Sequence, residues 1–438
     1  MPPHEDTPYL SELRVSGFKS IVEGVHLPIR DLNVLCGANS SGKSSFMQAI
    51  LLLKQTTEAK TDPPGPLHLE GHLLNFSNVD QIKPIGLKLG VDDWEMAVGF
   101  SFGDASPLDI TFAAATGLTP LRLKQTKIRL RQQEEVCIRP GAAFEDVSIL
   151  LGQGEREFLQ SGPTAGPPDV AIITHRWSTR ISFQQGPNLI LTDIDELDAA
   201  DDFLRWLFYL PGLRDNPERH SPLTNVRGQA HGGFHQYSPS IIAGWCLGSN
   251  PDRILSLNHD LRLLNLTSAV EARRVNDARV EVSVARTPGT SSEMISIADV
   301  GIGTSQVLPV LVALHAAAPG QFVYVEQPEL HLHPKAQAAL AGVLVSAVNR
   351  GVRLIIETHS PALLQALQIQ IATGKLDPER ARFHWFQRDG DGATKVDSVT
   401  PTADGAYGDW PEDFSEVDAR LDDEYLDATL FKELKDAG

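Results

Sequence analysis

Two glycines, a lysine and a serine between residues 37 and 44 have the spacing of a phosphate-binding loop. Gly37 and Gly42 are separated by four residues, and Lys43 and Ser44 follow at once. Small residues let several backbone N–H groups point at one phosphate chain. The lysine ammonium can reach the β- and γ-phosphates, and the serine hydroxyl can ligate Mg²⁺. These residue types predict a site for ATP and Mg²⁺ formed by Gly37, Asn39, Ser40, Ser41, Gly42, Lys43, Ser44 and Ser45.

A loop of this kind lies between a strand and a helix, and the flanking sequence supplies both. Residues 32–36 are an apolar run typical of a buried strand. Residues 46–53 are apolar and free of proline, and the predicted helix continues to about Gln55. The N-terminus of that helix adds the positive end of its dipole to the phosphate site. A chance match would lack these neighbours, so the stretch indicates a P-loop.

Acidic and polar residues follow two further apolar runs. A four-residue strand precedes Glu326, Gln327 and Glu329. An acid at such a strand end is the Walker B arrangement, in which Glu326 would share the Mg²⁺ with the P-loop serine. The next apolar strand ends in residues 357–361, ETHSP, where His359 could sense the γ-phosphate.

A second glycine-rich stretch lies between the P-loop and Glu326. Gly301 and Gly303 precede Thr304 and Ser305, and an apolar helix follows. Small residues at a helix N-terminus leave N–H groups available to an anion. The stretch therefore predicts a second phosphate contact.

These four motifs, in this order, resemble the ABC-type ATPase heads of the SMC/RecF/OLD class. Within it, the chain is similar to the bacterial AAA-type ATPases that carry EQPELHLHP. The matching segments are GANSSGKSS at 37–45 for Walker A, VGIGTSQVLP at 300–309 for the signature, VYVEQPELHLHP at 323–334 for Walker B and the D-loop, and THS at 358–360 for the H-switch. The resemblance implies that ATP is sandwiched between two heads, with Gly303, Thr304 and Ser305 of one head contacting the γ-phosphate held by the other. It also implies service in DNA repair or anti-phage defence, commonly beside a nuclease partner.

The chain departs from that class at one catalytic position. The usual Walker B strand ends in Asp-Glu, with the Asp near the metal and the Glu as general base. Here Glu326 takes the first place and Gln327 the second. An amide cannot accept a proton from the attacking water, although it can orient that water. We therefore expect slow ATP hydrolysis, or a base supplied by Glu326, Glu329 or His359.

The order of the predicted elements indicates an α/β fold with a P-loop NTPase core. Short strand-like runs over residues 67–135 predict an antiparallel β lobe, and residues 196–209 predict an amphipathic helix. From residue 294, strands and helices alternate as in a parallel sheet with crossovers. We predict an ABC-type head made of residues 1–100 with Walker A and residues 238–400 with the signature, Walker B and H-switch, an inserted lobe over 101–237, and an acidic, partly helical tail over 401–438.

Composition narrows the classes of partner and compartment. The net charge is −18, so the chain is not expected to coat DNA non-specifically. The densest basic run, residues 121–131, is interpreted as the solvated face of a strand. No apolar run reaches the length of a membrane span, and the three cysteines, which lack CxxC spacing, fit a reducing cytoplasm.

Two further groups of residues could either bind a metal ion or have a purely structural role. His220, His231 and His235 share one long loop, but no cysteine or acid stands at zinc-ligand spacing. Asp389 and Asp391 form a DxD that could belong to a TOPRIM nuclease centre, yet the surrounding RDGDG has the composition of a hairpin turn. The structural reading is favoured for both.

These observations predict a Mg-ATP-dependent switch. ATP would pair two heads of a homodimer or a higher even-numbered oligomer, and hydrolysis would separate them. The switch would control DNA or a separate effector protein such as a nuclease. The alternatives are a self-contained OLD-type nuclease and a nearly inactive nucleotide-binding scaffold.

Overall fold

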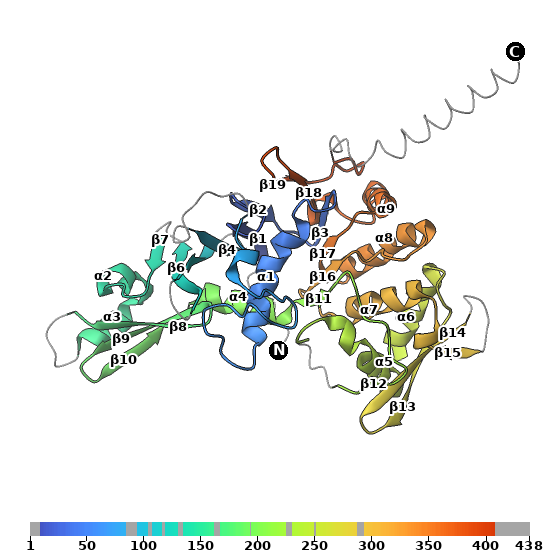
Figure 1. Cartoon of the computed structure of the whole chain (residues 1–438), viewed down its shortest axis with the longest axis horizontal. Helices are drawn as coiled ribbons and strands as arrows, with labels where there is room; N and C mark the ends of the chain where they lie inside the picture. Colours follow the sequence, from blue (N-terminus) through green and yellow to red (C-terminus); the bar gives the residue numbers. More distant parts are fainter. Residues whose placement is uncertain are drawn as a thin grey trace, which may run out of the picture.

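In the computed structural model, the described residues are 9–84, 94–103, 107–115, 119–129, 135–161, 167–192, 194–224, 230–248, 251–286 and 293–407. The described strands form four sheets, with helices packed around and between them (Figure 1). The α-helices are α1 (Lys43–Glu58), α2 (Phe144–Val147), α3 (Gln153–Gln160), α4 (Asp195–Trp206), α5 (Ser238–Leu247), α6 (Pro251–Leu263), α7 (Ile302–Ala316), α8 (Pro334–Asn349) and α9 (Pro361–Ala372). None of the helices in these ranges is long and apolar enough to cross a membrane.

A six-stranded sheet forms the centre of the molecule. Its order is β11 (Phe208–Leu210), β16 (Phe322–Glu326), β17 (Arg353–Glu357), β3 (Leu32–Gly37), β18 (Ala381–Arg388) and β19 (Thr394–Val399). The first five strands are parallel, and β19 returns antiparallel to β18. Strands covered on both faces need continuous apolar runs, and every residue of β3 and β17 is buried. The motif residues therefore follow strands whose carboxyl ends share one edge.

The two faces of this sheet bury different helices. Val34 and Ile356 belong to a core that includes α7, α8 and α9. Their sequence neighbours Leu35 and Ile355 face the other way, into a core with α1 and the antiparallel sheet. This division follows from the alternation of side chains along a strand. Figure 1 shows the same layers, with α8 and α9 on one side of β17 and α1 on the other.

A second six-stranded sheet is antiparallel and packs over α1. Its order is β2 (Val25–Pro28), β1 (Leu10–Ser16), β4 (Glu95–Phe102), β5 (Pro107–Ala114), β6 (Leu121–Arg129) and β7 (Glu135–Ile138). The predicted α/β class and antiparallel β lobe are thus confirmed. The basic residues Arg122 and Arg129 of β6 are exposed, as expected for the solvated face of a strand.

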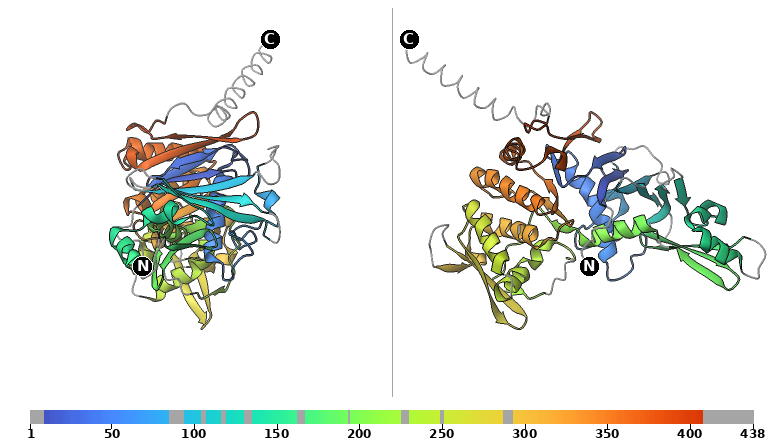
Figure 2. Two further views of the ribbon diagram at one scale, coloured as in Figure 1. Left: turned by 90° about the vertical axis from the view of Figure 1, so that its left-hand side faces the viewer. Right: turned by 180° about the vertical axis from the view of Figure 1, so that it is seen from behind.

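Two smaller sheets lie at opposite ends of the molecule (Figures 1 and 2). One is the meander of β8 (Asp169–His175), β9 (Ser178–Gln185) and β10 (Asn188–Thr192). The other joins β12 (Ser221–Pro222), β14 (Arg279–Ala285) and β13 (Val270–Asn276), with β15 (Met294–Ser296) also paired to β14. The segment predicted as an inserted lobe, 101–237, contributes strands to all four sheets.

One predicted helix ends earlier than the sequence suggested. The helix expected over residues 196–209 stops at Trp206, and Phe208–Leu210 forms β11 beside Walker B strand β16. Pro211 follows, and a residue before proline is biased toward the extended conformation. The predicted tail helix falls in residues 408–438, outside the described residues.

Candidate functional site

The P-loop joins β3 to α1 and folds around the Lys43 ammonium. Lys43 Nζ donates to the carbonyls of Gly37 at 2.9 Å and Ala38 at 2.8 Å, and lies 3.3 Å from Ser41 Oγ. Burial lowers the pKa of Lys43 to about 8, and the Glu357 carboxylate partly opposes that shift. The cation is therefore held at the mouth of the loop, where the sequence predicts the phosphates.

The β18–β19 hairpin packs closely against the two glycines of this loop. Gly37 has φ +139° and Gly42 has φ +112°, a backbone region that favours glycine. A Cβ on Gly37 would collide with the Phe386 carbonyl, and one on Gly42 would collide with Thr394 Oγ1. The β18–β19 hairpin thus fixes the loop from outside. Cys36, at the end of β3, is fully buried behind the loop, and burial raises the pKa of its thiol.

Glu326, the predicted Walker B acid, is held by three donors. Its Oε1 accepts from the Tyr209 hydroxyl at 3.0 Å and lies 3.1 Å from the Tyr324 hydroxyl. Its Oε2 accepts from the Gly212 backbone N–H at 3.0 Å. The two tyrosine rings stack with centroids 5.4 Å apart. Sequence reasoning gave neither tyrosine a role, and it predicted Tyr209 as the last residue of a helix.

A second carboxylate, Glu357, also faces the P-loop. Ser44 Oγ donates to Glu357 Oε1 at 2.6 Å, and the Tyr324 hydroxyl lies 3.0 Å from Glu357 Oε2. Burial raises the pKa of Glu357, and the nearby Glu326 charge adds to that shift, while the Ser44 hydrogen bond and Lys43 oppose it. Sequence reasoning noted Glu357 at a strand end but gave it no role. Its signal was the position of an acid directly before Thr358 and His359.

Glu329 and His359 form a separate contact beyond the strand ends. Glu329 Oε1 accepts from Thr358 Oγ1 at 2.6 Å and from the His359 backbone N–H at 3.1 Å. Burial raises the pKa of Glu329, although these two hydrogen bonds act against the shift. Burial and the Lys43 charge lower the pKa of His359 to about 4, while a hydrogen bond with the Gly37 backbone raises it. His359 is thus neutral near pH 7 and lies beside the P-loop, as a γ-phosphate sensor would.

Gln327 turns the chain at the end of β16. Its φ is +44°, and its backbone N–H donates to the Glu357 carbonyl at 2.7 Å. The Gln327 side chain lies near Gly212, since a Cβ there would be 3.8 Å from Gln327 Oε1. The predicted catalytic residues therefore gather around two strand ends, with the P-loop beside them.

The signature residues begin α7 and lie against other loops. A Cβ on Gly303 would lie 2.9 Å from the His331 carbonyl, so this glycine allows a close approach of the two backbones. Thr304 and Ser305 are buried, and Ser305 Oγ donates to the Ile302 carbonyl at 3.0 Å. Ile302 is 49% exposed at the helix N-terminus. Gly301 and Ile302, rather than the buried Thr304 and Ser305, thus form the exposed end of this helix.

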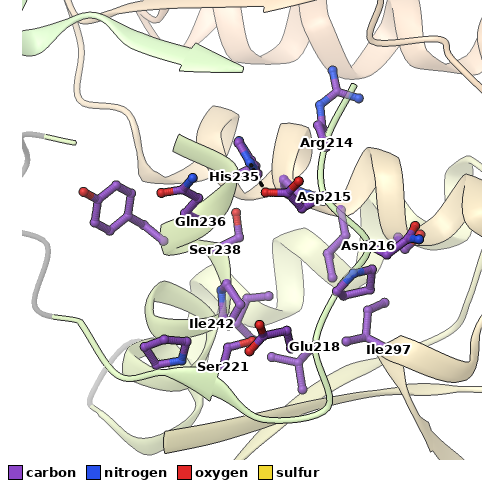
Figure 3. A pocket seen from close by; sticks show the side chains of 18 of the residues that line it. Arg214, Asp215, Asn216, Glu218, Ser221, His235, Gln236, Ser238, Ile242 and Ile297 are labelled. Atoms are coloured by element: carbon purple, nitrogen blue, oxygen red, sulfur yellow. Dashed lines mark ion pairs between the residues drawn. The ribbon is translucent and has the colours of Figure 1, made fainter. Parts of the chain in front are cut away.

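Arg214 links the signature helix to the Walker B strand. Its guanidinium donates to the carbonyls of Gln306 at 3.1 Å and Glu326 at 2.9 Å, and Gln306 Nε2 donates back to the Arg214 carbonyl at 3.0 Å. A cavity of about 490 Å³ lies beside this link. Figure 3 shows Asp215 and His235 facing each other in its wall, with 3.6 Å between Asp215 Oδ2 and His235 Nε2. Sequence reasoning gave Arg214 no role.

The two groups of residues that were weighed as possible metal sites make structural contacts. His235 contacts Asp215, His231 Nδ1 lies 4.0 Å from Glu58 Oε1, and the His220 carbonyl accepts from Arg279. Asp389 begins the turn between β18 and β19, as the hairpin interpretation predicted. Throughout the described part of the chain, no group of three or more His, Cys, Asp or Glu residues is placed to hold a metal ion.

Comparison with known families adds to this geometry. Residues 185–365 match the family described as "AAA domain, putative AbiEii toxin, Type IV TA system". Residues 9–102 match the family described as "AAA ATPase domain". The two segments contain all four motifs. The chain therefore carries the segments of an AAA-type ATPase.

Solved structures that match the chain include heads of SMC proteins, at 11–14% sequence identity. One is an SmcHead bound to the C-winged helix domain of ScpA, with a TM-score of 0.44, 14% identity and coverage of 90% of this ATPase and 98% of that chain. Another is the SMC head domain from Thermotoga maritima, with a TM-score of 0.37, 14% identity and coverage of 89% and 99%. A third, from Pyrococcus furiosus, has a TM-score of 0.41, 11% identity and coverage of 90% and 96%. No curated protein matches this ATPase.

Proposed function

We propose that this ATPase is a Mg-ATP-dependent switch whose heads pair on ATP and separate after hydrolysis. The observation that carries the proposal is the gathering of Lys43, Ser44, Glu357 and His359 at one edge of the central sheet. Carboxylate and hydroxyl oxygens are the ligands that Mg²⁺ prefers, so the donor set fits the ion. Bound Mg²⁺ would neutralise charge that develops on the transferred phosphoryl group.

Each residue then has a distinct task in the switch. Lys43 would leave the Gly37 and Ala38 carbonyls for the β- and γ-phosphates, to which it brings a point charge. Gln327 would orient the attacking water, and neutral His359 would hydrogen-bond the γ-phosphate. Such a site has an amide where a stronger base is usual, so slow turnover is expected.

The second half of the switch is the signature helix of another chain. The chain carries one P-loop and one signature, so a complete composite site requires two copies. A closed two-fold arrangement creates two such sites together. Arg214 connects the signature helix to Walker B within one head, and it would transmit pairing to the strand ends.

We propose that the switch acts in anti-phage defence or DNA maintenance and controls a separate effector such as a nuclease, or DNA. The matched family description, which names the AbiEii toxin and a type IV toxin–antitoxin system, supports the defence setting. Sequencing the genes beside its own would identify the effector candidate. Co-purification with that gene product, strengthened by ATP, is the expected result.

The nucleotide site itself is tested by Lys43→Ala. Loss of a buried charge that pairs with phosphate costs about 2–5 kcal/mol, so ATP affinity should fall by at least about 30-fold in isothermal titration. Lys375→Ala, at an exposed position after α9, is the matched control and should bind normally. Equal ATP affinity in the two variants would refute the P-loop assignment.

A further inference from the structure

We infer that Glu357, rather than Glu326, is the carboxylate that holds Mg²⁺ together with Ser44. The Walker B acid would then serve as a positioning residue for the sheet edge. The inference rests on the proposed Mg-ATP site and refines which strand supplies its acid.

The order of the strands places Glu357 closer to the P-loop. β17 lies directly between β3 and β16, with Glu357 paired to Leu35 on one side and to Glu326 on the other. Glu326 is therefore two strands away from the strand that leads into the P-loop, and Glu357 is one strand away. The contact is direct, because Ser44 Oγ donates to Glu357 Oε1 at 2.6 Å.

This hydrogen bond is the one that a metal-binding serine requires. A hydroxyl that ligates Mg²⁺ uses an oxygen lone pair and still carries its proton. The proton needs an acceptor in a buried site, since an unpaired buried donor costs about 1–3 kcal/mol. Glu357, which is only 4% exposed, accepts it already. Ser44 can thus bind the ion without rearrangement of this contact.

Glu326 is committed to other partners. The Tyr209 and Tyr324 hydroxyls lie within 3.1 Å of its Oε1, and the Gly212 N–H donates to its Oε2. Turning this carboxylate toward a metal would break contacts that join β11 and the Arg214 loop to β16. The structure therefore gives Glu326 a positioning task, in which it holds the loop that reaches the signature helix.

The Tyr324 hydroxyl can donate to only one of its two carboxylate neighbours. It lies 3.1 Å from Glu326 Oε1 and 3.0 Å from Glu357 Oε2, but it has one proton to donate. Glu326 keeps Tyr209 and Gly212 as donors even when Tyr324 turns to its neighbour. Glu326 lies beside Glu357 in the strand pair and has Arg214 nearby, whereas Glu357 has Lys43 nearby. A divalent ion held by Ser44 and Glu357 would add positive charge on the P-loop side of this pair.

The test compares metal binding in Glu357→Gln and Glu326→Gln. Mn²⁺ replaces Mg²⁺ as the probe, and free Mn²⁺ is followed by its electron paramagnetic resonance signal during titration of the ATP-bound chain. Loss of a carboxylate beside a metal ligand typically costs 10- to 100-fold in metal affinity. Glu357→Gln should show about that loss, and ATP affinity measured with EDTA should be unchanged or slightly higher. Glu326→Gln should keep Mn²⁺ affinity within about twofold of wild type.

Glu357→Asp is the control for a folding defect. It keeps a carboxylate with a shorter reach, so it should bind Mn²⁺ more tightly than Glu357→Gln at similar thermal stability. Loss of Mn²⁺ affinity in Glu326→Gln that equals or exceeds the loss in Glu357→Gln would overturn the inference. So would wild-type Mn²⁺ affinity in both Glu357 variants. A wild-type chain that binds no ATP would instead refute the proposed function, which separates the two failures.

Discussion

Among the catalytic candidates, Gln327 has a left-handed backbone conformation at the end of a strand. Its φ of +44° and its backbone bond to the Glu357 carbonyl fix the start of the loop that contains Glu329. The backbone therefore sets the direction of the side chain, whatever that side chain is. This makes the position suitable for substitution, because the contact that holds the turn does not involve the amide group.

If the Gln327 amide orients water, Gln327→Ala should lower kcat by roughly 10- to 100-fold and leave ATP affinity unchanged, since misplaced groups lose about this much. Gln327→Glu supplies a proton acceptor at the same place and should equal or exceed the wild-type rate. Gln387→Ala, an exposed position on β18, is the matched control. Steady-state phosphate release measures all three. A Gln327→Ala enzyme with normal kcat would remove Gln327 from the mechanism.

At the scale of elements, the central sheet tolerates one buried imidazole. His384 lies on β18 beside β3, fully buried, with Nδ1 2.8 Å from Ser398 Oγ. Burial, together with the Arg382 charge, lowers its pKa to about 3. The native state thus keeps this imidazole neutral at pH values where an unfolded chain would protonate it.

The sign of the resulting pH dependence follows from linkage. An unfolded histidine has a pKa of about 6.5, so the stability contribution is complete above that pH and is lost as the pH falls toward 3. Between pH 7 and pH 5 the loss is about 2 kcal/mol. His384→Asn can keep the Ser398 bond without titrating. Between pH 7 and pH 5, its free energy of unfolding in urea should therefore fall by about 2 kcal/mol less than that of the wild-type protein. Gln387→Ala, at an exposed position of β18, removes no titrating group and should fall like wild type. Equal falls in all three proteins would contradict the assignment.

The elements also show where sequence reasoning succeeds. The strand, loop and helix around Lys43 are contiguous, so local pattern and composition were sufficient to predict them. Glu357 was not assigned because its bond with Ser44 joins residues 313 positions apart, and only the order β16, β17, β3 brings them together. Phe208 and Tyr209 of β11 were predicted as helix because they continue an amphipathic pattern, while pairing with β16 decides the outcome.

At the scale of the whole molecule, the signature helix has an exposed end. Ile302 is 49% exposed at the N-terminus of α7, whereas Ser305 is buried. A substitution at Ile302 can therefore test the proposed head pairing without disturbing the core. The position suits a charge that repels the γ-phosphate of an opposing head.

Ile302→Glu chains should bind ATP normally and hydrolyse it slowly, and Lys43→Ala chains should bind ATP at least about 30-fold more weakly than wild type. A mixed dimer has one composite site with an intact P-loop from the first chain and an intact signature from the second. Mixing should therefore raise turnover above that of either variant alone, in a phosphate-release assay at several ratios. Leu255→Glu, at an exposed position on α6, is the control for surface charge. Normal turnover by Ile302→Glu alone would rule out the two-head mechanism.

The buried thiol of Cys36 can report how often the nucleotide-binding core opens. Its thiol is fully buried behind the P-loop, while Cys137 and Cys246 are partly exposed. With Cys137 and Cys246 replaced by Ser, a thiol-reactive dye can label the chain only when β3 becomes accessible, so the labelling rate reports transient opening of the sheet. ATP at 100 times its Kd stabilises the closed state by about 2.7 kcal/mol and should slow labelling about 100-fold. A labelling rate that does not change with ATP would mean that the core opens without releasing the nucleotide.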